Sequence, residues 1–320
     1  MPAPVMKSGQ PLIFLLNAAA GRCDPQALSA LIEATFSQAG RSVEIVLATP
    51  GELSAVAARA AEKAQRLSTA IVAVGGDGTV NTVAQAAHAQ GCVMGVVAQG
   101  TFNYFARTHG IPAEPEQALL ALLDAQVVPV QVATVNKRVF LVNASLGLYP
   151  ELLEDREAYK ARFGRSRFVA LAAACITLLR SHRQLRLEIE LGDSVYQVRT
   201  PTLFVGNNRL QLDQFGVQAS AGRTQAFEPG RVAAVMHKPI GTLAMLGLML
   251  HGAMGTLGEA ESVKSFQFSH MVVKPGQRRV KVAMDGEVSW LRSPIEFLVP
   301  SQPLYLLQPR SAANGLEVRA

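Results

Sequence analysis

A glycine-rich stretch that carries one carboxylate offers the clearest chemistry in this sequence. Residues 70–74 form an apolar, β-branched run, which ends abruptly at Gly-Gly-Asp-Gly-Thr (75–79) before a helical pattern begins near Val80. Glycines between a strand and a helix let the backbone come close to a ligand. The unpaired N–H groups at the start of the following helix stabilise an anion. The stretch predicts a phosphate site, with a tight βα connection that holds no ligand as the alternative.

The carboxylate of Asp77 lies inside this predicted phosphate loop. It would repel a phosphate unless a cation lay between the two groups. Mg²⁺ suits that position, because it favours one or two carboxylates together with phosphate oxygens. The loop is neither a Walker loop, since no Gly-Lys-Ser/Thr follows it, nor a GxGxxG motif. Asp77 is therefore the candidate metal ligand.

Alternating strand and helix patterns in the first 130 residues must position this loop. Repeated βα units imply a parallel sheet covered by helices, with ligands bound beyond the carboxyl ends of the strands. The loops 17–21, 49–51, 75–79 and 99–101 would share that rim. We interpret residues 12–16 as the first strand, because this apolar run is too short for a signal peptide. The strands are expected at 12–16, 43–48, 70–74 and 93–98, and the helices at 26–39, 52–66, 80–89 and 117–125.

The pattern changes after residue 130, where many segments alternate apolar and polar residues as antiparallel strands do. Helices are expected there only near 152–181 and 239–256. We therefore expect an α/β nucleotide-binding domain in residues 1–130 and a β-rich domain in 131–320, and leave open a return of the last ~20 residues to the first domain. The later strands are expected at 130–135, 138–143, 186–191, 196–205, 232–235, 265–273, 279–284 and 295–299.

Composition limits the classes of partner. The formal charge of +6 suits anionic partners, but no basic run is interleaved with aromatic residues, so nucleic acid is not expected. Cys23, Cys92 and Cys175 lie far apart without zinc spacing, which favours a reduced, cytoplasmic setting. The apolar stretches 168–179 and 240–254 are shorter than the ~20 residues of a membrane span, so buried helices are favoured.

The motifs together resemble the diacylglycerol-kinase-type lipid kinases, which include bacterial lipid kinases and sphingosine kinases. Residues 75–81 match the GGDGTxN signature of that family, and residues 100–103 match its GTxN segment. Residues 17–21 match its NPxSG loop at the first and last positions, residues 143–147 resemble the segment that opens its second domain, and residues 285–287 match its late Asp-Gly-Glu. GGDGT alone is shared with NAD kinases.

The resemblance implies an ATP- and Mg²⁺-dependent kinase that transfers the γ-phosphoryl group to a lipid hydroxyl, with a diacylglycerol-like acceptor. It implies a β-sandwich-like second domain that holds the lipid. By resemblance Glu287 would be the general base, and Asp77 would organise metal and phosphates. The residues expected to bind ATP are Asn17, Gly21, Thr49, Gly75, Gly76, Asp77, Gly78, Thr79, Asn81, Gly100 and Thr101.

Several positions depart from the family pattern. Thr82, Ala98 and Tyr104 replace an acidic residue, a proline and an aspartate, and residues 227–230 replace a metal loop, so we do not carry that metal site over. Tyr104 with Phe105 could line an apolar acceptor site or simply pack. On local sequence alone, Asp285-Gly286 is also a two-residue hairpin turn.

Basic residues gather between 156 and 186 and could attract anionic lipid headgroups, at about 1 kcal/mol per charge, or form a solvated helix face. We expect a cytoplasmic protein that binds membranes transiently, and an oligomer stays open. The alternatives are a kinase of a soluble alcohol, similar to NAD kinase, and a catalytically silent nucleotide- or lipid-binding protein. The sequence names neither the lipid nor the pathway. The basic residues are Arg156, Lys160, Arg162, Arg165, Arg167, Arg180, Arg183 and Arg186.

Overall fold

The computed structural model divides into two compact units, unit 1 with Met1–Val132 and Ser301–Ala320, and unit 2 with Ala133–Pro300. The helices expected near 152–181 and 239–256 lie outside the described residues, and so do the basic residues singled out above, except Arg186. The structure describes residues 4–7, 9–18, 24–49, 51–148, 150, 184–207, 228–237 and 263–310.

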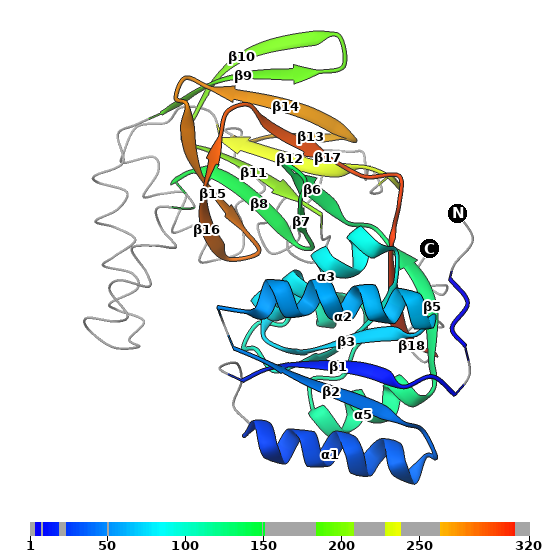
Figure 1. Ribbon diagram of the computed structural model, residues 1–320. Helices are drawn as coiled ribbons and strands as arrows, with labels where there is room; N and C mark the ends of the chain where they lie inside the picture. The colour runs from blue at the N-terminus through cyan, green and yellow to red at the C-terminus, as the bar shows by residue number, and fades with distance from the viewer. Residues whose placement is uncertain are drawn as a thin grey trace. The chain divides into compact units, whose positions relative to one another are not determined.

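Unit 1 is built on a six-stranded sheet in the order β2-β1-β3-β4-β18-β5 (Figure 1). Neighbouring strands run parallel except β18 and β5, which pair antiparallel. The central strands β1, β3 and β4 are buried along nearly their whole length, as parallel strands covered on both faces must be. The bounds are β1 (Leu12–Asn17), β2 (Val43–Ala48), β3 (Ala70–Gly75), β4 (Val93–Ala98), β5 (Ala125–Val130) and β18 (Leu304–Pro309).

The helices of unit 1 cover both faces of this sheet: α2 and α3 lie on one face, and α1 and α5 on the other (Figure 1). Asp24 caps α1 by accepting the N–H groups of Gln26 and Ala27, both at 3.4 Å. The predicted α/β domain with a parallel sheet is confirmed. The bounds are α1 (Pro25–Gln38), α2 (Leu53–Leu67), α3 (Asp77–Gln90), α4 (Tyr104–Thr108) and α5 (Pro115–Leu123).

Strands β5 and β18 differ from the expected elements. The sequence pattern predicts one strand at 130–135, whereas β5 ends at Val130 and β6 begins at Ala133. Pro129 sits in β5, which is an edge strand and can lack an N–H donor. β18 inserts between β4 and β5 from the far end of the chain, and no local pattern announces such a partner.

Unit 2 contains two antiparallel six-stranded sheets, with the orders β10-β9-β14-β17-β6-β7 and β13-β12-β11-β8-β15-β16. The predicted β-rich second part is confirmed. The bounds are β6 (Ala133–Val135), β7 (Arg138–Phe140), β8 (Asn143–Gly147), β9 (Leu185–Leu191), β10 (Ser194–Thr200), β11 (Thr202–Gly206), β12 (Val232–His237), β13 (Val263–Phe268), β14 (His270–Pro275), β15 (Arg279–Met284), β16 (Glu287–Arg292) and β17 (Ile295–Leu298).

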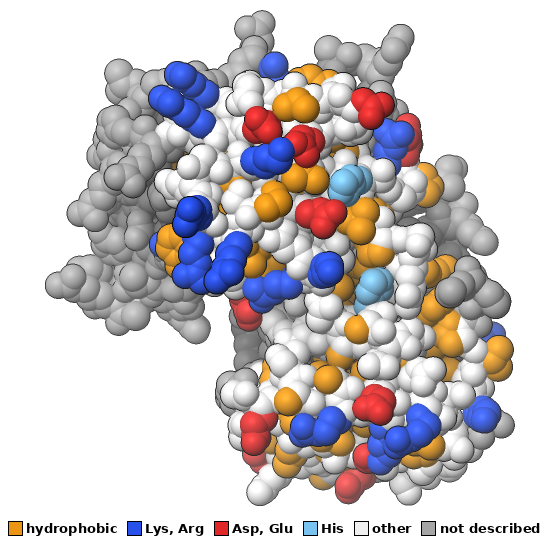
Figure 2. All heavy atoms as spheres, turned by 45° about the horizontal axis from the view of Figure 1, so that its top comes forward, with side chains coloured by type: hydrophobic (Ala, Val, Ile, Leu, Met, Phe, Trp, Pro, Cys, Tyr) orange, Lys and Arg blue, Asp and Glu red, His pale blue; other side chains and the backbone are white. Residues whose placement is uncertain are grey.

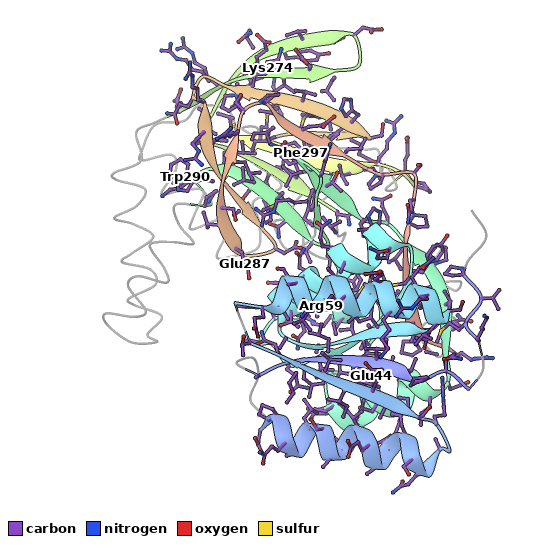
Figure 3. The ribbon with its side chains drawn as sticks, in the orientation of Figure 1. Glu44, Arg59, Lys274, Glu287, Trp290 and Phe297 are labelled. Carbon is purple, nitrogen blue, oxygen red and sulfur yellow. The ribbon has the colours of Figure 1, made fainter. Side chains whose placement is uncertain are left out.

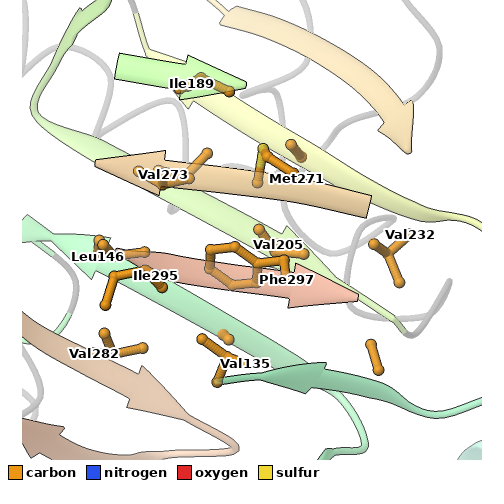
Figure 4. Packing of buried hydrophobic residues seen from close by; sticks show 14 of the residues in the cluster. Val135, Leu146, Ile189, Val205, Val232, Met271, Val273, Val282, Ile295 and Phe297 are labelled. Atoms are coloured by element: carbon orange, nitrogen blue, oxygen red, sulfur yellow. The ribbon is translucent and has the colours of Figure 1, made fainter. Parts of the chain in front are cut away.

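One hydrophobic cluster draws residues from both sheets of unit 2, so the sheets pack face to face as a sandwich (Figure 4). Leu146 and Val282 come from one sheet, and Met271 and Phe297 from the other. The Phe297 ring meets the rings of Phe140 and Phe268 edge-on, each with centroids 6.5 Å apart. Burial of this shared face holds unit 2 together.

Two segments that the sequence predicts as single strands are each divided between the two sheets. Residues 196–205 fall in β10 and β11, and residues 265–273 in β13 and β14. The breaks at Pro201 and Ser269 let the chain cross from one sheet to the other. Each break is so short that the alternating pattern runs through it.

In the part of the chain that the structure describes, no helix combines the length and apolarity that crossing a bilayer requires.

Candidate functional site

The loop after β1 is tied to the first turn of α3 by one side-chain hydrogen bond. Asn17, the last residue of β1, donates from Nδ2 to the Thr79 Oγ1 at 3.1 Å. Thr79 is only 3% exposed, so this bond is shielded from water. Asn17 and Thr79 were both predicted site residues, and the structure brings them together at the carboxyl ends of neighbouring strands.

Glycines permit this packing. A Cβ on Gly75 would lie 2.6 Å from Thr79 Oγ1, so only glycine leaves room for the threonine side chain. A Cβ on Gly100 would lie 3.2 Å from Gly76 Cα, and the Gln99 N–H donates to the Gly75 carbonyl at 2.7 Å. The loops after β3 and β4 therefore pack backbone against backbone, as a phosphate cradle requires.

Asp77 is the first residue of α3 and faces the loop after β4. Its Oδ2 accepts the N–H of Asn103 at 3.2 Å. Burial raises the pKa of this carboxyl, and the backbone N–H groups of Asn103 and Tyr104 counteract part of that rise. Among the described residues no side chain caps α3, because the N-cap is Gly76. The N–H groups of its first turn are left to solvent or to an anion.

The remaining predicted phosphate ligands are less tightly held. Thr49 is exposed and donates to Glu52 Oε2 at 2.9 Å within its own turn. Thr101 is exposed beside Gly100, and Gly78 and Asn81 lie in the first turns of α3. Thr82 donates to the Gly78 carbonyl at 2.9 Å, a bond along the helix that occupies its hydroxyl. Gly21 lies outside the described residues.

In unit 2, the Asp285-Gly286 pair forms a two-residue turn between β15 and β16. Both residues have positive φ, 47° and 92°, as a type I′ hairpin turn requires, and Met284 pairs with Glu287 across the turn. Residues 285 and 286 form the turn that their local sequence indicates, and the role of Glu287 as a base stays a prediction. The Asp285 carboxylate accepts the N–H groups of residues 141, 142 and 143 at 2.8, 2.9 and 3.0 Å.

Glu287 is the carboxylate of this motif that faces solvent. It begins β16 at the tip of the hairpin and is exposed (Figure 3). Because Asp285 holds the turn against the segment that leads into β8, the position of the Glu287 backbone is fixed. Glu228 is one of the residues 227–230 that replace the family's metal loop, and it pairs with Arg231 at 2.9 Å. Phe227 lies outside the described residues.

One known protein family matches most of unit 1. Residues 11–135 match the diacylglycerol kinase catalytic domain. Over these residues the chain is similar to that family. The matched range contains β1, β3, α3 and β4, and with them Asn17, Thr79, Asp77 and the glycines that pack together. The predicted resemblance is confirmed.

Relatives and solved structures are similar to this chain to different extents. A protein of Serratia proteamaculans (strain 568) named "Probable lipid kinase YegS-like" is 37% identical over 115 residues. The aligned stretch is 34% of this chain and spans only 38% of that relative. A diacylglycerol kinase structure from Bacillus anthracis str. Sterne has a TM-score of 0.67 at 17% identity, and covers 96% of this chain and 99% of its own. An NAD kinase of Archaeoglobus fulgidus in complex with ATP scores 0.51 at 14% identity over 97% and 98% of the two chains. The last two likenesses show the fold alone.

Asn103 links the loop after β4 to Asp77. The residue belongs to the motif at residues 100–103, but the sequence predicted no role for it. It adopts a left-handed conformation with φ of 48°, which asparagine tolerates. Its Nδ2 donates to the Gly100 carbonyl at 3.0 Å, while its N–H holds Asp77. Its Oδ1 is buried and has no partner among the described residues. The Gly-Thr-x-Asn spacing was the signal for this bridge.

Tyr104, which replaces an aspartate of the family pattern, and its neighbour Phe105 have side chains in different environments. Phe105 is 3% exposed and packs on the His109 ring with centroids 4.6 Å apart, so it belongs to the core. Burial lowers the pKa of His109 to about 4. Tyr104 instead stacks on Phe102 at 5.7 Å and 3°, and Phe102 is 46% exposed. Phe102 and Tyr104 therefore form an apolar surface in the loop after β4, whereas Phe105 packs inside.

Proposed function

We propose that this protein is an ATP-dependent lipid kinase that transfers the γ-phosphoryl group to the hydroxyl of a diacylglycerol-like lipid. The observation that carries the proposal is the cradle at the start of α3. There Asn17 reaches Thr79, Gly76 meets Gly100, and Asp77 is held by Asn103. Such a cradle offers backbone N–H groups and a carboxylate to a nucleotide phosphate. The name of the Serratia relative supports the lipid as acceptor.

The donor set at this cradle fits Mg²⁺. In the described part of the chain, no three His, Cys, Asp or Glu side chains gather as a metal site. Mg²⁺ needs no such group, because it takes one or two carboxylates together with phosphate oxygens and water. We assign Asp77 as its protein ligand, and the bound ion would supply charge neutralisation on the phosphates.

Glu287 is proposed as the base. The acceptor hydroxyl oxygen bonds to the γ-phosphorus, the bond from that phosphorus to the leaving oxygen of ADP breaks, and the hydroxyl proton passes to Glu287. Asp285 cannot take this role, because its carboxylate already accepts three backbone N–H groups. An exposed carboxylate fixed at a hairpin tip is suited to receive a proton.

The two units would divide the substrates between them. We assign the nucleotide to the α/β part, expected in residues 1–130, and the lipid to the β-rich part in 131–320. The protein would act as a peripheral enzyme on the cytoplasmic side of a membrane. A kinase of a soluble alcohol, similar to NAD kinase, and a silent nucleotide- or lipid-binding protein are the alternatives to this proposal.

The test is transfer of labelled γ-phosphate from ATP and Mg²⁺ to mixed lipid micelles. The micelles carry diacylglycerol, monoacylglycerol, ceramide, sphingosine and phosphatidylglycerol, and a parallel reaction contains NAD. Label in a lipid is expected, with most in diacylglycerol. Label in NADP would replace the proposal with the soluble-alcohol kinase. If the protein bound ATP but no product were labelled, the alternative of a catalytically silent binding protein would replace the proposal.

A further inference from the structure

Five exposed arginines surround two neighbouring hollows on unit 2. The first hollow, of about 840 Å³, is lined by Arg278, Arg279 and Arg292. The second, of about 470 Å³, is lined by Arg186 and Arg199. Residues 275–277 line both, so the hollows adjoin. Blue side chains gather near the left edge of the described surface in Figure 2.

Four of these arginines are arranged as like-charged pairs. Arg186 stands directly opposite Arg199 across β9 and β10, and Arg279 stands opposite Arg292 across β15 and β16. Like charges directly opposite on neighbouring strands destabilise a sheet. Two such pairs beside one another cost stability unless an anion binds between or above them. Their placement points to a negatively charged partner.

Nearby carboxylates do not neutralise these arginines. Glu188 and Glu190 both pair with Lys274, and Glu296 pairs with His270. Within the described ranges, none of the five arginines makes an ion pair with an aspartate or glutamate. These three glutamates belong to the sheet that carries Arg186 and Arg199, and each already has a basic partner. The arginines therefore keep their charge for another molecule.

An exposed tryptophan identifies the kind of anion. Trp290 lies two residues from Arg292 on β16, so both side chains project from the same face. It is 57% exposed, and Lys281 on the opposite strand stands over its ring at 5.4 Å. A soluble phosphate gains nothing from an exposed indole. A bilayer offers both anionic headgroups and the interfacial zone that tryptophan prefers.

We propose that this arginine surface, formed by Arg186, Arg199, Arg278, Arg279, Arg292 and Trp290, docks on an anionic lipid bilayer. The inference rests on the proposed function, because a lipid kinase must reach a substrate that is held in a membrane. Arg186 is the one described member of the basic set that the sequence singled out. Glu287 projects from the opposite face of β16, so docking leaves the proposed base off this surface.

The experiment measures binding to vesicles without ATP. Trp290 is the only tryptophan of the chain, so its emission reports this surface alone. Vesicles of phosphatidylcholine with phosphatidylglycerol are expected to shift the emission to shorter wavelength, and vesicles of phosphatidylcholine are not. The double variant Arg279→Gln/Arg292→Gln is expected to sediment with anionic vesicles at least about tenfold more weakly. The matched control Arg59→Gln/Arg66→Gln removes two exposed arginines of α2 and should bind as the unaltered protein does.

Three results would overturn the proposal: equal vesicle binding by both double variants, unchanged Trp290 emission in the bound protein, or displacement of vesicles by millimolar inorganic phosphate. The last would assign the hollows to a soluble anion. Phosphate transfer to a short-chain diacylglycerol in detergent micelles separates this inference from the proposed function. The double variant should keep that activity. Vesicle binding without transfer by any form would leave the docking surface standing and remove the kinase.

Discussion

The chain contains two Asp-Gly pairs, Asp77-Gly78 at the start of α3 and Asp285-Gly286 in a hairpin turn, and their carboxylates have different surroundings. Asp77 begins a helix, is partly buried and has a raised pKa. Asp285 lies in a hairpin turn, and its carboxylate accepts three backbone N–H groups within 3.0 Å. The residue type is the same, but the backbone consumes one carboxylate and leaves the other with capacity for a cation. Burial sets the two apart more than the number of bound N–H groups does, because Asp77 also accepts backbone N–H groups from Asn103 and Tyr104 and its pKa is nevertheless raised.

The largest effect is expected from removing the charge of Asp77. Asp77→Asn should lower kcat for phosphate transfer on the order of a thousandfold, because the charge that organises metal and phosphates is lost. Steady-state kinetics with ATP and micellar diacylglycerol measures this. Asp124→Asn is the control, since Asp124 is an exposed carboxylate of the same unit that pairs with Arg310. Equal activity of Asp77→Asn and the control would remove Asp77 from the mechanism.

Asp285 should behave as a structural residue. Asp285→Ala is expected to lower the free energy of unfolding of unit 2 by about 3 kcal/mol, because three N–H groups lose a charged acceptor. Alanine is also strained at a φ of 47°. Urea titration followed by Trp290 emission reports this unit. Asp285→Asn keeps one acceptor oxygen and the turn conformation, so it should lose about half as much. A full-length transition unchanged by Asp285→Ala would contradict the structural role.

Glu287 and Asp285 belong to the same hairpin, and we expect a catalytic role for the first and a structural role for the second. Glu287→Gln should lower kcat on the order of a hundredfold, as expected for a lost general base, while ATP affinity and unfolding stay unchanged. Equilibrium nucleotide binding and single-turnover transfer separate the two quantities. Glu296→Gln on β17 is the matched control in the same unit. Normal turnover by Glu287→Gln would show that residues 285–287 serve only as a hairpin turn.

The sequence predicted the contacts between residues that are close together in the chain, but not those between residues that are far apart in it. A buried apolar run followed by glycines predicted β3 and its loop, although α3 begins at Asp77 and not near Val80, since glycines in a first helical turn read as loop. The pattern could not show that Asp285 would bind residues 141–143, because nothing local joins those segments. It left open a return of the last ~20 residues to the first domain, but it did not predict β18 as a strand. Its partners β4 and β5 lie far away in the chain.

The smallest effect concerns stability, and it carries opposite signs for the two aspartates. Burial raises the folded-state pKa of Asp77 above 3.8, so the folded protein binds this proton more tightly than the unfolded chain does. Unliganded protein therefore loses stability as pH rises from 3.8 through the folded-state pKa. Asparagine carries no charge at any pH and still offers an oxygen to the Asn103 N–H.

Asp77→Asn should consequently raise the melting temperature at pH 7 without nucleotide, and the gain should shrink as pH falls and disappear below 3.8. Asp285→Asn should lower the melting temperature at pH 7, since it weakens bonds that a charged carboxylate makes. Thermal unfolding of both variants across this pH range tests the pair. If both asparagine variants melted below the unaltered protein at pH 7, the Asp77 carboxylate would be a structural group like that of Asp285, and the division between a chemical and a structural aspartate would fail.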